Sequence, residues 1–296
     1  MVSRKTAIGN TALVEVDGIY AKLECANPCG SIKDRMVRYI LDESEKKGFL
    51  KPGMKIIEAT SGNTGISLAY FAKKMGYDVT IVMPVNMTEE RKQRIRDLGA
   101  HLTLCSEEGS FAEAVSIRDD ILSRDSSYFN LDQFSSPLNV ECHYTTTGQE
   151  ILKEHTLNPV EAFVAGVGTG GSLLGTAKAL KKVYPDVHIA AVEPSESAVM
   201  SGGKPGIHGI PGIGDGFIPA IVKGINQPLS ELINEVICVS SKQAQNAARR
   251  IREDYGLPVG ISSGANYLAA KELFKKFGTV VTLFPDGSVL YGSLGL

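Results

Sequence analysis

Residues 54–76, MKIIEATSGNTGISLAYFAKKMG, decide the fold class of this chain. The apolar run over 54–59 predicts a short strand, a turn of small residues follows it, and the apolar spacing over 64–75 predicts a helix that ends at Gly76. The next run, Asp78 to Met83, is rich in valine and isoleucine and predicts another strand. Strands separated by helices connect by right-handed crossovers, so we expect a mostly parallel sheet flanked by helices.

The same alternation extends in both directions along the chain. We expect helices over 33–47, 88–99, 113–124, 147–155, 171–183, 242–255 and 264–277, and strands over 101–105, 162–165, 188–192, 235–239 and 279–284. One stretch, 202–219, interrupts the order with seven glycines and three prolines, which favours a long ordered loop. Long loops inside compact domains are usually functional.

Composition excludes several classes of function. The chain has 296 residues, a net charge of −2 and 43% apolar residues. The near balance of charge argues against a nucleic-acid interface or an anionic membrane surface, and no apolar run approaches the roughly 20 residues that span a bilayer. The basic run over 91–96 is typical of a solvated helix face. The N-terminus has no apolar segment typical of a secretory signal, so we expect a cytoplasmic protein.

The five cysteines predict neither a disulfide framework nor a metal site. Their number is odd and their spacing irregular, which suits reduced thiols. Cys25 and Cys29 are close in sequence, but no second Cys/His pair at zinc-ligand spacing accompanies them. We therefore expect no metal.

Three turns rich in glycine and serine follow predicted strands or open predicted helices. In open α/β sheets, ligands bind beyond the carboxyl ends of the strands. The first turn, 60–65, offers hydroxyls, an amide and a helix start, which suit a carboxylate. The second, 166–172, can bind phosphate through backbone N–H groups. The third, 260–264, is also readable as a simple helix cap.

The second turn supports an alternative class as well. Gly166, Gly168 and Gly171 satisfy G-x-G-x-x-G, and Glu193 ends the next strand about 20 residues later, where a dinucleotide site places its ribose-binding acid. This pattern is typical of NAD-dependent oxidoreductases, although the motif is weak on its own.

Residues 27–35, NPCGSIKDR, resemble the N-P-x-x-S-x-K-D-R motif of the fold type II pyridoxal-phosphate (PLP) enzymes. This motif and the three turns follow one another in the order of the cysteine synthase (O-acetylserine sulfhydrylase) and cystathionine β-synthase family. The resemblance also covers 133–134, 145–148, 212–217 and 285–286, whereas the dinucleotide alternative explains one motif of four. It implies a two-domain, tryptophan synthase β-like α/β fold. The smaller, substrate-closing domain would span 35–136, and the larger, PLP-phosphate-binding domain would combine 1–34 with 137–296.

The resemblance also implies a role for each matched residue. Lys33 would carry the cofactor as a Schiff base and move the proton on the substrate Cα. Asn63 would bind the PLP 3′-oxygen, and Ser262 would face the pyridine nitrogen. The phosphate would be held by Gly168, Thr169, Gly170, Gly171 and Ser172. The substrate carboxylate would be bound by Thr60, Ser61, Gly62, Thr64 and Gln133.

The implied reaction is β-replacement through α-aminoacrylate, with O-acetylserine and sulfide giving cysteine and acetate. Asp215 is one departure from the family pattern, because it stands where many relatives have a small residue. A carboxylate there would serve as general base or acid in an alternative reaction, such as a cysteine lyase or cystathionine β-synthase-like reaction that releases hydrogen sulfide from cysteine. A solvated loop carboxylate or a local cap explains Asp215 equally well.

The resemblance further implies a homodimer and a serine acetyltransferase as a partner. A paralogue that has lost the cofactor and only senses or scaffolds would keep the same motifs, so the sequence leaves a binding-module class open.

Overall fold

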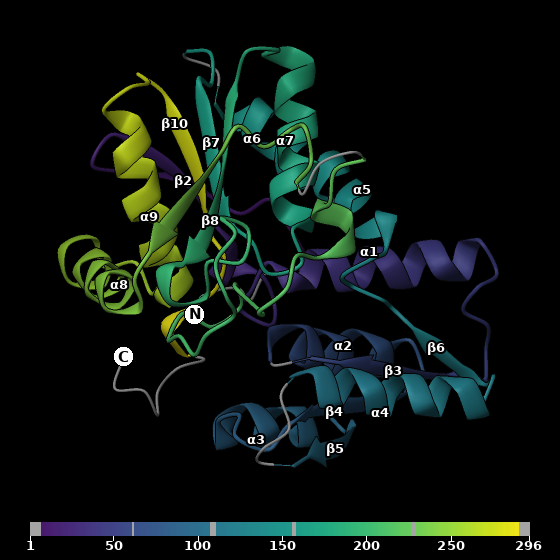
Figure 1. Ribbon diagram of the computed structural model, residues 1–296. Helices are drawn as coiled ribbons and strands as arrows, with labels where there is room; N and C mark the ends of the chain where they lie inside the picture. Colours follow the sequence, from purple (N-terminus) through teal and green to yellow (C-terminus); the bar gives the residue numbers. More distant parts are fainter. Residues whose placement is uncertain (1–6, 61, 107–110, 156–157, 226–228, 290–296) are drawn as a thin grey trace. The chain divides into compact units, whose positions relative to one another are not determined.

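The computed structural model describes residues 7–60, 62–106, 111–155, 158–225 and 229–289, and it divides into two compact units (Figure 1). The larger unit combines 7–32 with 134–289, and the smaller unit comprises 33–133. Each contains its own sheet with helices on its faces, which confirms the predicted α/β class.

The sheet of the larger unit has the strand order β1-β2-β10-β7-β8-β9. All neighbours are parallel except β1 and β2, which form an antiparallel hairpin. The strands are β1 Leu13–Val16, β2 Ile19–Leu23, β7 Ala162–Gly166, β8 His188–Pro194, β9 Glu235–Val239 and β10 Val280–Phe284. The helices are α5 Pro137–Thr145, α6 Thr147–Glu154, α7 Gly171–Val183, α8 Ser241–Tyr255 and α9 Ile261–Phe274, and the 3-10 turns are η1 Glu24–Ala26, η2 Ser195–Ser197 and η3 Ala220–Val222.

Side-chain alternation along β7 separates the core of this unit into two layers. Ala162 and Val164 belong to the apolar cluster that includes α8 and α9, whereas Phe163 and Ala165 belong to the cluster that includes α7. Figure 1 shows α8 and α9 on one side of the sheet and α5, α6 and α7 on the other. Successive strand residues point to opposite faces, so an apolar run buries both faces of a parallel strand.

The smaller unit has a four-stranded parallel sheet in the order β5-β4-β3-β6. Its strands are β3 Lys55–Ala59, β4 Asp78–Pro84, β5 His101–Cys105 and β6 Tyr128–Asn130, and its helices are α1 Lys33–Lys46, α2 Asn63–Lys74, α3 Glu89–Asp97 and α4 Phe111–Arg124. Helix α4 packs on Ile57 and Val82. A Cβ at Gly65 of α2 would lie 3.2 Å from Ile95 Cδ1 and 3.3 Å from Ile81 Cγ2, so α2, α3 and β4 meet there.

The residue patterns miss four strands or helices and misjudge one helix face. They do not predict the hairpin strands β1 and β2, the three-residue β6, or α5, which lies against α7. The prediction of a solvated face over 91–96 is wrong for Arg91 and Lys92, whose exposures are 7% and 4%. Both lie on the face of α3 that packs into the unit, together with the fully buried Ile95.

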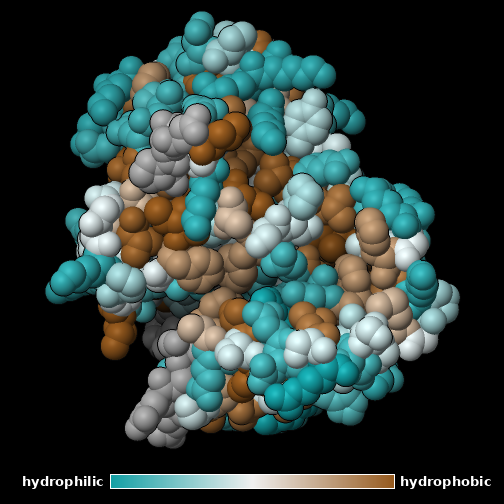
Figure 2. Space-filling model, turned by 45° about the vertical axis from the view of Figure 1, so that its right-hand side comes forward, coloured by the Kyte–Doolittle hydropathy of each residue, from teal (hydrophilic) through white to brown (hydrophobic). Residues whose placement is uncertain are grey.

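On the face shown in Figure 2, apolar residues gather in patches with hydrophilic residues around them. Across the residues that the structure describes, no helix combines the length and the apolar character needed to cross a membrane.

Glu58 is a buried carboxyl group on β3 of the smaller unit. It is 0% exposed, its Oε1 accepts a hydrogen bond from the Ala59 N–H at 3.1 Å, and its Oε2 has no hydrogen-bond partner among the described residues. The nearest cation, Arg118 Nη1, is 3.5 Å from Oε1. Burial raises the pKa of Glu58 to about 8, the Arg118 charge opposes this rise, and the Asp132 charge adds to it.

We predict that Glu58 makes the protein less stable as pH rises. Between the ordinary value of 4.5 and about 8, the folded state holds a proton on Glu58 that the unfolded chain has released. The free energy of unfolding should therefore fall by about 1.4 kcal/mol for each pH unit from this group alone. Glu58→Gln, which cannot ionise, should flatten this fall in urea unfolding curves between about pH 5 and pH 8.

Glu43→Gln is the control, because a hydrogen bond from Lys46 lowers the pKa of Glu43 and its contribution is lost only at more acid pH. Wild type and Glu58→Gln with parallel pH profiles would contradict the prediction.

Candidate active site

The turn from β7 to α7 leaves a row of backbone N–H groups without acceptors. Gly170 is left-handed at φ +87° and leads into the first turn of α7. In the described part of the chain, no protein group accepts a hydrogen bond from the backbone N–H of Gly168, Thr169, Gly170 or Ser172. Such groups at a helix start bind anions, and phosphate above all.

Glycines at 168 and 171 allow the close packing of this turn, because a Cβ at either position would clash with a neighbour. A Cβ at Gly168 would lie 2.3 Å from the Gly212 carbonyl oxygen, and one at Gly171 would lie 1.9 Å from Asn139 Oδ1. Asn139 Nδ2 donates to Thr169 Oγ1 at 2.9 Å, which leaves the hydroxyl proton of Thr169 available for an anion. The predicted phosphate residues therefore come together in one turn, and the turn fits a phosphate group.

The glycine-rich loop that contains Asp215 is fixed to the same turn. The Gly214 N–H donates to the Val167 carbonyl at 3.0 Å, and His208 Nε2 lies 2.9 Å from the Gly214 carbonyl oxygen. Gly214 and Gly216, at φ +72° and +83°, flank the half-buried Asp215. The loop backbone on either side of Asp215 thus adopts conformations that suit glycine.

The third turn forms the start of α9, three residues earlier than predicted. Ser262 and Ser263 both lie in its first turn, at 2% and 0% exposure. The Ser263 hydroxyl is buried without a hydrogen-bond partner among the described residues. A Cβ at Gly264 would lie 2.0 Å from the Ala244 carbonyl oxygen, which explains how closely α9 approaches α8.

In the smaller unit, the residues predicted to bind a carboxylate lie together at the end of β3. Thr64 Oγ1 donates to Gln133 Oε1 at 2.7 Å, and Gln133 Nε2 donates to the Ala59 carbonyl at 3.3 Å. The Gly62 N–H donates to Thr60 Oγ1 at 3.2 Å. Ser61 lies outside the described residues.

Lys33 is the first residue of α1, and Asn63 is the first residue of α2. Asp34, directly after Lys33 and fully buried, accepts a hydrogen bond from Ser67 Oγ at 2.5 Å. This contact ties the first turn of α1 to α2, and thus fixes Lys33 relative to the helix that Asn63 begins.

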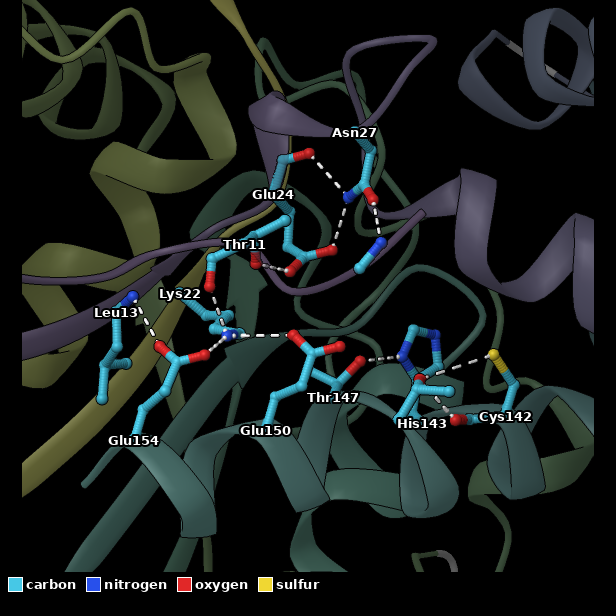
Figure 3. A network of polar contacts seen from close by, with 12 residues as sticks. Thr11, Leu13, Lys22, Glu24, Asn27, Cys142, His143, Thr147, Glu150 and Glu154 are labelled. Carbon is cyan, nitrogen blue, oxygen red and sulfur yellow. Dashed lines mark hydrogen bonds and ion pairs between the residues drawn. The ribbon is translucent and has the colours of Figure 1, made fainter. Parts of the chain in front are cut away.

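A polar network fixes the chain segment that leads to Lys33 (Figure 3). Asn27 Nδ2 donates to Glu24 Oε2 at 2.7 Å, and Glu24 Oε1 accepts from Thr11 Oγ1 at 2.7 Å. The fully buried Lys22 Nζ lies 3.0 Å from Glu150 Oε2 and 2.6 Å from Glu154 Oε1. The Ile32 N–H donates to the Pro285 carbonyl at 2.8 Å. The segment is therefore held by the side-chain network at its start and by this backbone hydrogen bond directly before Lys33.

Glu193 does not serve a ribose. Its carboxylate accepts hydrogen bonds from the N–H groups of Met200 and Ser201, at 2.8 and 2.9 Å, and from the Ser201 hydroxyl at 2.6 Å. It ties down the loop after β8, and the structure gives the dinucleotide alternative no further support. Within the described ranges there is also no group of three or more His, Cys, Asp or Glu side chains suited to a metal ion.

Sequence reasoning missed two asparagines that shape the phosphate turn. Asn139 orients Thr169, while Asn266 accepts from the Gly166 N–H at 2.8 Å and donates to the Leu283 carbonyl at 2.8 Å. Asn266 thereby links the end of β7 to β10. No spacing signal marks either residue, because each reaches the turn from another helix.

Comparison with known proteins agrees with this site. The family model described as "Pyridoxal-phosphate dependent enzyme" matches residues 4–286. Cysteine synthase of Staphylococcus aureus is 39% identical over 300 residues, which cover 98% of this chain and 94% of that protein. The crystal structure of cysteine synthase from Entamoeba histolytica superposes with a TM-score of 0.90 at 37% identity, over 98% of this chain and 88% of that one. A hydrogen sulfide-producing enzyme of Fusobacterium nucleatum gives 0.89 at 36% identity, over 98% and 99% of the two chains. This chain therefore belongs to the pyridoxal-phosphate-dependent enzymes, and pyridoxal 5′-phosphate is its cofactor.

Proposed function

We propose that this enzyme replaces the β-substituent of an O-activated serine, with O-acetylserine and sulfide giving cysteine and acetate. The observation that carries the proposal is the pair of anion-binding turns. One has the backbone N–H groups of Gly168, Thr169, Gly170 and Ser172, which have no acceptor among the described residues, for the cofactor phosphate. The other gathers Thr60, Thr64 and Gln133 for a substrate carboxylate. The similarity to enzymes named cysteine synthase supports the same reaction.

Each residue has a definite part in this proposal. When bound, PLP withdraws electrons from the substrate Cα. Lys33 Nζ would attach the cofactor and take the proton from the substrate Cα, Asn63 would bind the 3′-oxygen of the cofactor, and Ser262 would face its pyridine nitrogen. A neutral hydroxyl such as that of Ser262 does not keep a positive charge on the ring nitrogen, which favours prompt loss of the β-substituent over other reactions at Cα.

Asp215 supports a second candidate reaction, the release of hydrogen sulfide from cysteine. It lies between two left-handed glycines in a loop that is hydrogen-bonded to the phosphate turn. A carboxylate near the reacting Cβ would activate water as a general base or protonate a leaving hydroxyl as a general acid. The similarity to hydrogen sulfide-producing enzymes favours this alternative.

We also infer that the enzyme acts in the cytoplasm as a homodimer, and that a serine acetyltransferase is a partner, because the cysteine synthase family suggests these properties. The smaller unit would serve as the substrate-closing domain and the larger as the phosphate-binding domain. Light scattering on the holoenzyme would overturn the dimer if it gave the mass of one chain.

The cofactor attachment is testable by chemical trapping. Borohydride reduction of the holoenzyme followed by proteolysis should give a peptide in which Lys33 carries the pyridoxyl group. Lys33→Ala should lose this label and at least roughly 100-fold in activity, because the variant lacks the group that moves the Cα proton. Lys47→Ala is the control, because Lys47 is exposed directly after the end of α1, and this variant should keep both the label and the activity. A label on another lysine in the wild type would refute the assignment.

The role of Asp215 is testable by comparing amino-acid donors. Asp215→Ala should lower the rates with serine and cysteine by roughly 100-fold or more, because these reactions need a proton donor or acceptor at Cβ. The rate with O-acetylserine should stay within about threefold, because acetate leaves without a proton. Product identification and initial rates for the three donors check this. Three unchanged rates would mean that Asp215 is a solvated loop carboxylate.

A further inference from the structure

The side chain of His208 connects two parts of the glycine-rich loop that contains Asp215. Its Nδ1 accepts a hydrogen bond from the Ile210 N–H at 3.2 Å, and its Nε2 lies 2.9 Å from the Gly214 carbonyl oxygen. A backbone N–H only donates and a carbonyl oxygen only accepts, so these two partners require the neutral imidazole with its hydrogen on Nε2. His208 therefore donates to the Gly214 carbonyl.

The part of the loop next to His208 is anchored to the rest of the larger unit. Ile210 is fully buried and belongs to the apolar cluster that includes α8 and α9. The Gly209 N–H donates at 2.7 Å to the hydroxyl of Ser241, the first residue of α8. The imidazole thus extends from a fixed point, and its hydrogen bond fixes the Gly214 carbonyl relative to that point.

The Gly214 carbonyl belongs to the peptide group that leads into Asp215. Glycines flank Asp215 on both sides, at φ +72° and +83°, and a glycine backbone rotates more freely than that of any other residue. Val167 accepts from the Gly214 N–H at 3.0 Å and His208 donates to its carbonyl, so the peptide groups on both sides of Gly214 are held. Ser197 Oγ also donates to this carbonyl, but at 3.5 Å, so the His208 bond is the shorter of the two.

Close packing limits the same part of the loop. A Cβ at Gly214 would lie 2.5 Å from Pro194 Cδ and 3.2 Å from His208 Nε2, so the end of β8 and the imidazole both pack against it. A general acid or base has to lie within hydrogen-bond reach of the proton that it transfers, and a displacement of about 1 Å can cost roughly 100-fold in rate. The position of the peptide group before Asp215 therefore matters for any proton transfer by Asp215.

We infer that His208 is the positioning residue that holds Asp215 for proton transfer at the substrate Cβ. His208 thereby supports the reactions of cysteine and serine, which need this transfer, and not the reaction of O-acetylserine, from which acetate leaves without a proton. The inference rests on the proposed function, which gives Asp215 its acid–base role.

The test compares two amide side chains at position 208. The amide nitrogen of glutamine can take the place of Nε2 and donate to the Gly214 carbonyl, whereas asparagine is one methylene shorter. His208→Asn should lower kcat with cysteine and serine by roughly 10-fold or more and leave KM within about threefold, because the substrate binds as before while Asp215 is displaced. The rate with O-acetylserine should change by less than about threefold, and His208→Gln should keep all three rates within about threefold of the wild type.

His188→Asn is the matched control, because it makes the same substitution at the other end of β8. His188 Nε2 lies 2.7 Å from Glu235 Oε1, and neither residue belongs to the loop. This variant should leave the ratio of the cysteine rate to the O-acetylserine rate unchanged. If His208→Asn does not fold, His208→Leu removes the same two hydrogen bonds and gives the same comparison.

Hydrogen exchange of the holoenzymes, followed by mass spectrometry, provides a measurement that does not depend on turnover. The peptide that contains Gly214 and Asp215 should exchange faster in His208→Asn than in the wild type, because the loop has lost one of its contacts. The same peptide should exchange at the wild-type rate in His208→Gln and in His188→Asn.

Several outcomes would overturn the inference. Equal losses with all three donors in His208→Asn would mean that His208 only supports the fold, and a loss that glutamine does not restore would mean that the bond to Gly214 is not responsible. The inference also fails if the wild type reacts with neither cysteine nor serine.

Asp215→Ala separates a failure of this inference from a failure of the proposed function. If Asp215→Ala lowers the cysteine and serine rates selectively and His208→Asn does not, only the role of His208 is wrong. If Asp215→Ala leaves all three rates unchanged, Asp215 has no part in proton transfer, and the role of His208 fails with it.

Discussion

The larger unit depends on one constraint, which is that backbone N–H groups at the carboxyl end of β7 have no acceptor within the described protein. A helix cannot satisfy the N–H groups of its own first turn, so they need a cap, water or a ligand. Here no described side chain caps α7, and glycines at 168 and 171 bring Gly212 and Asn139 to distances that a Cβ would forbid. The result is a closely packed turn whose free N–H donors suit an anion, and the cofactor phosphate is the anion proposed for it.

Buried charges show how the rest of the protein compensates for desolvation. Lys22 is fully buried and lies within ion-pair distance of two glutamates, as Figure 3 shows. Glu58 lies 3.5 Å from the Arg118 guanidinium, yet burial raises its pKa to about 8, so that it stays neutral over a wide pH range. A charge inside a protein is paired or is neutralised, and these two residues illustrate the two cases.

In the proposed function, cofactor binding and choice of reaction depend on different parts of the molecule. The turn over 168–172 is built from backbone groups and small residues, and larger side chains at Gly168 or Gly171 would clash with Gly212 or Asn139. The loop around Asp215 is held by hydrogen bonds of the Gly214 backbone with the Val167 carbonyl and with His208. The Asp215 side chain takes no part in these bonds, so the residue at position 215 can change without breaking them. Such an arrangement would allow one scaffold to serve either of the two proposed reactions, with the residue at position 215 deciding between them.

The sequence by itself determined the α/β class, most of the helices and strands, the three turns and the family, because period, glycine content and motif order are local properties of the chain. Tertiary structure decided which donors remain free and which charges are buried. Asn139 and Asn266 reach the phosphate turn from other helices, and Glu193 turned out to hold a loop in place. Arg91 resembled a solvated helix residue, since the sequence of α3 does not reveal that Gly62 leaves space for its guanidinium. Close approach between segments distant in sequence has no local signal, and for that reason only the folded chain shows it.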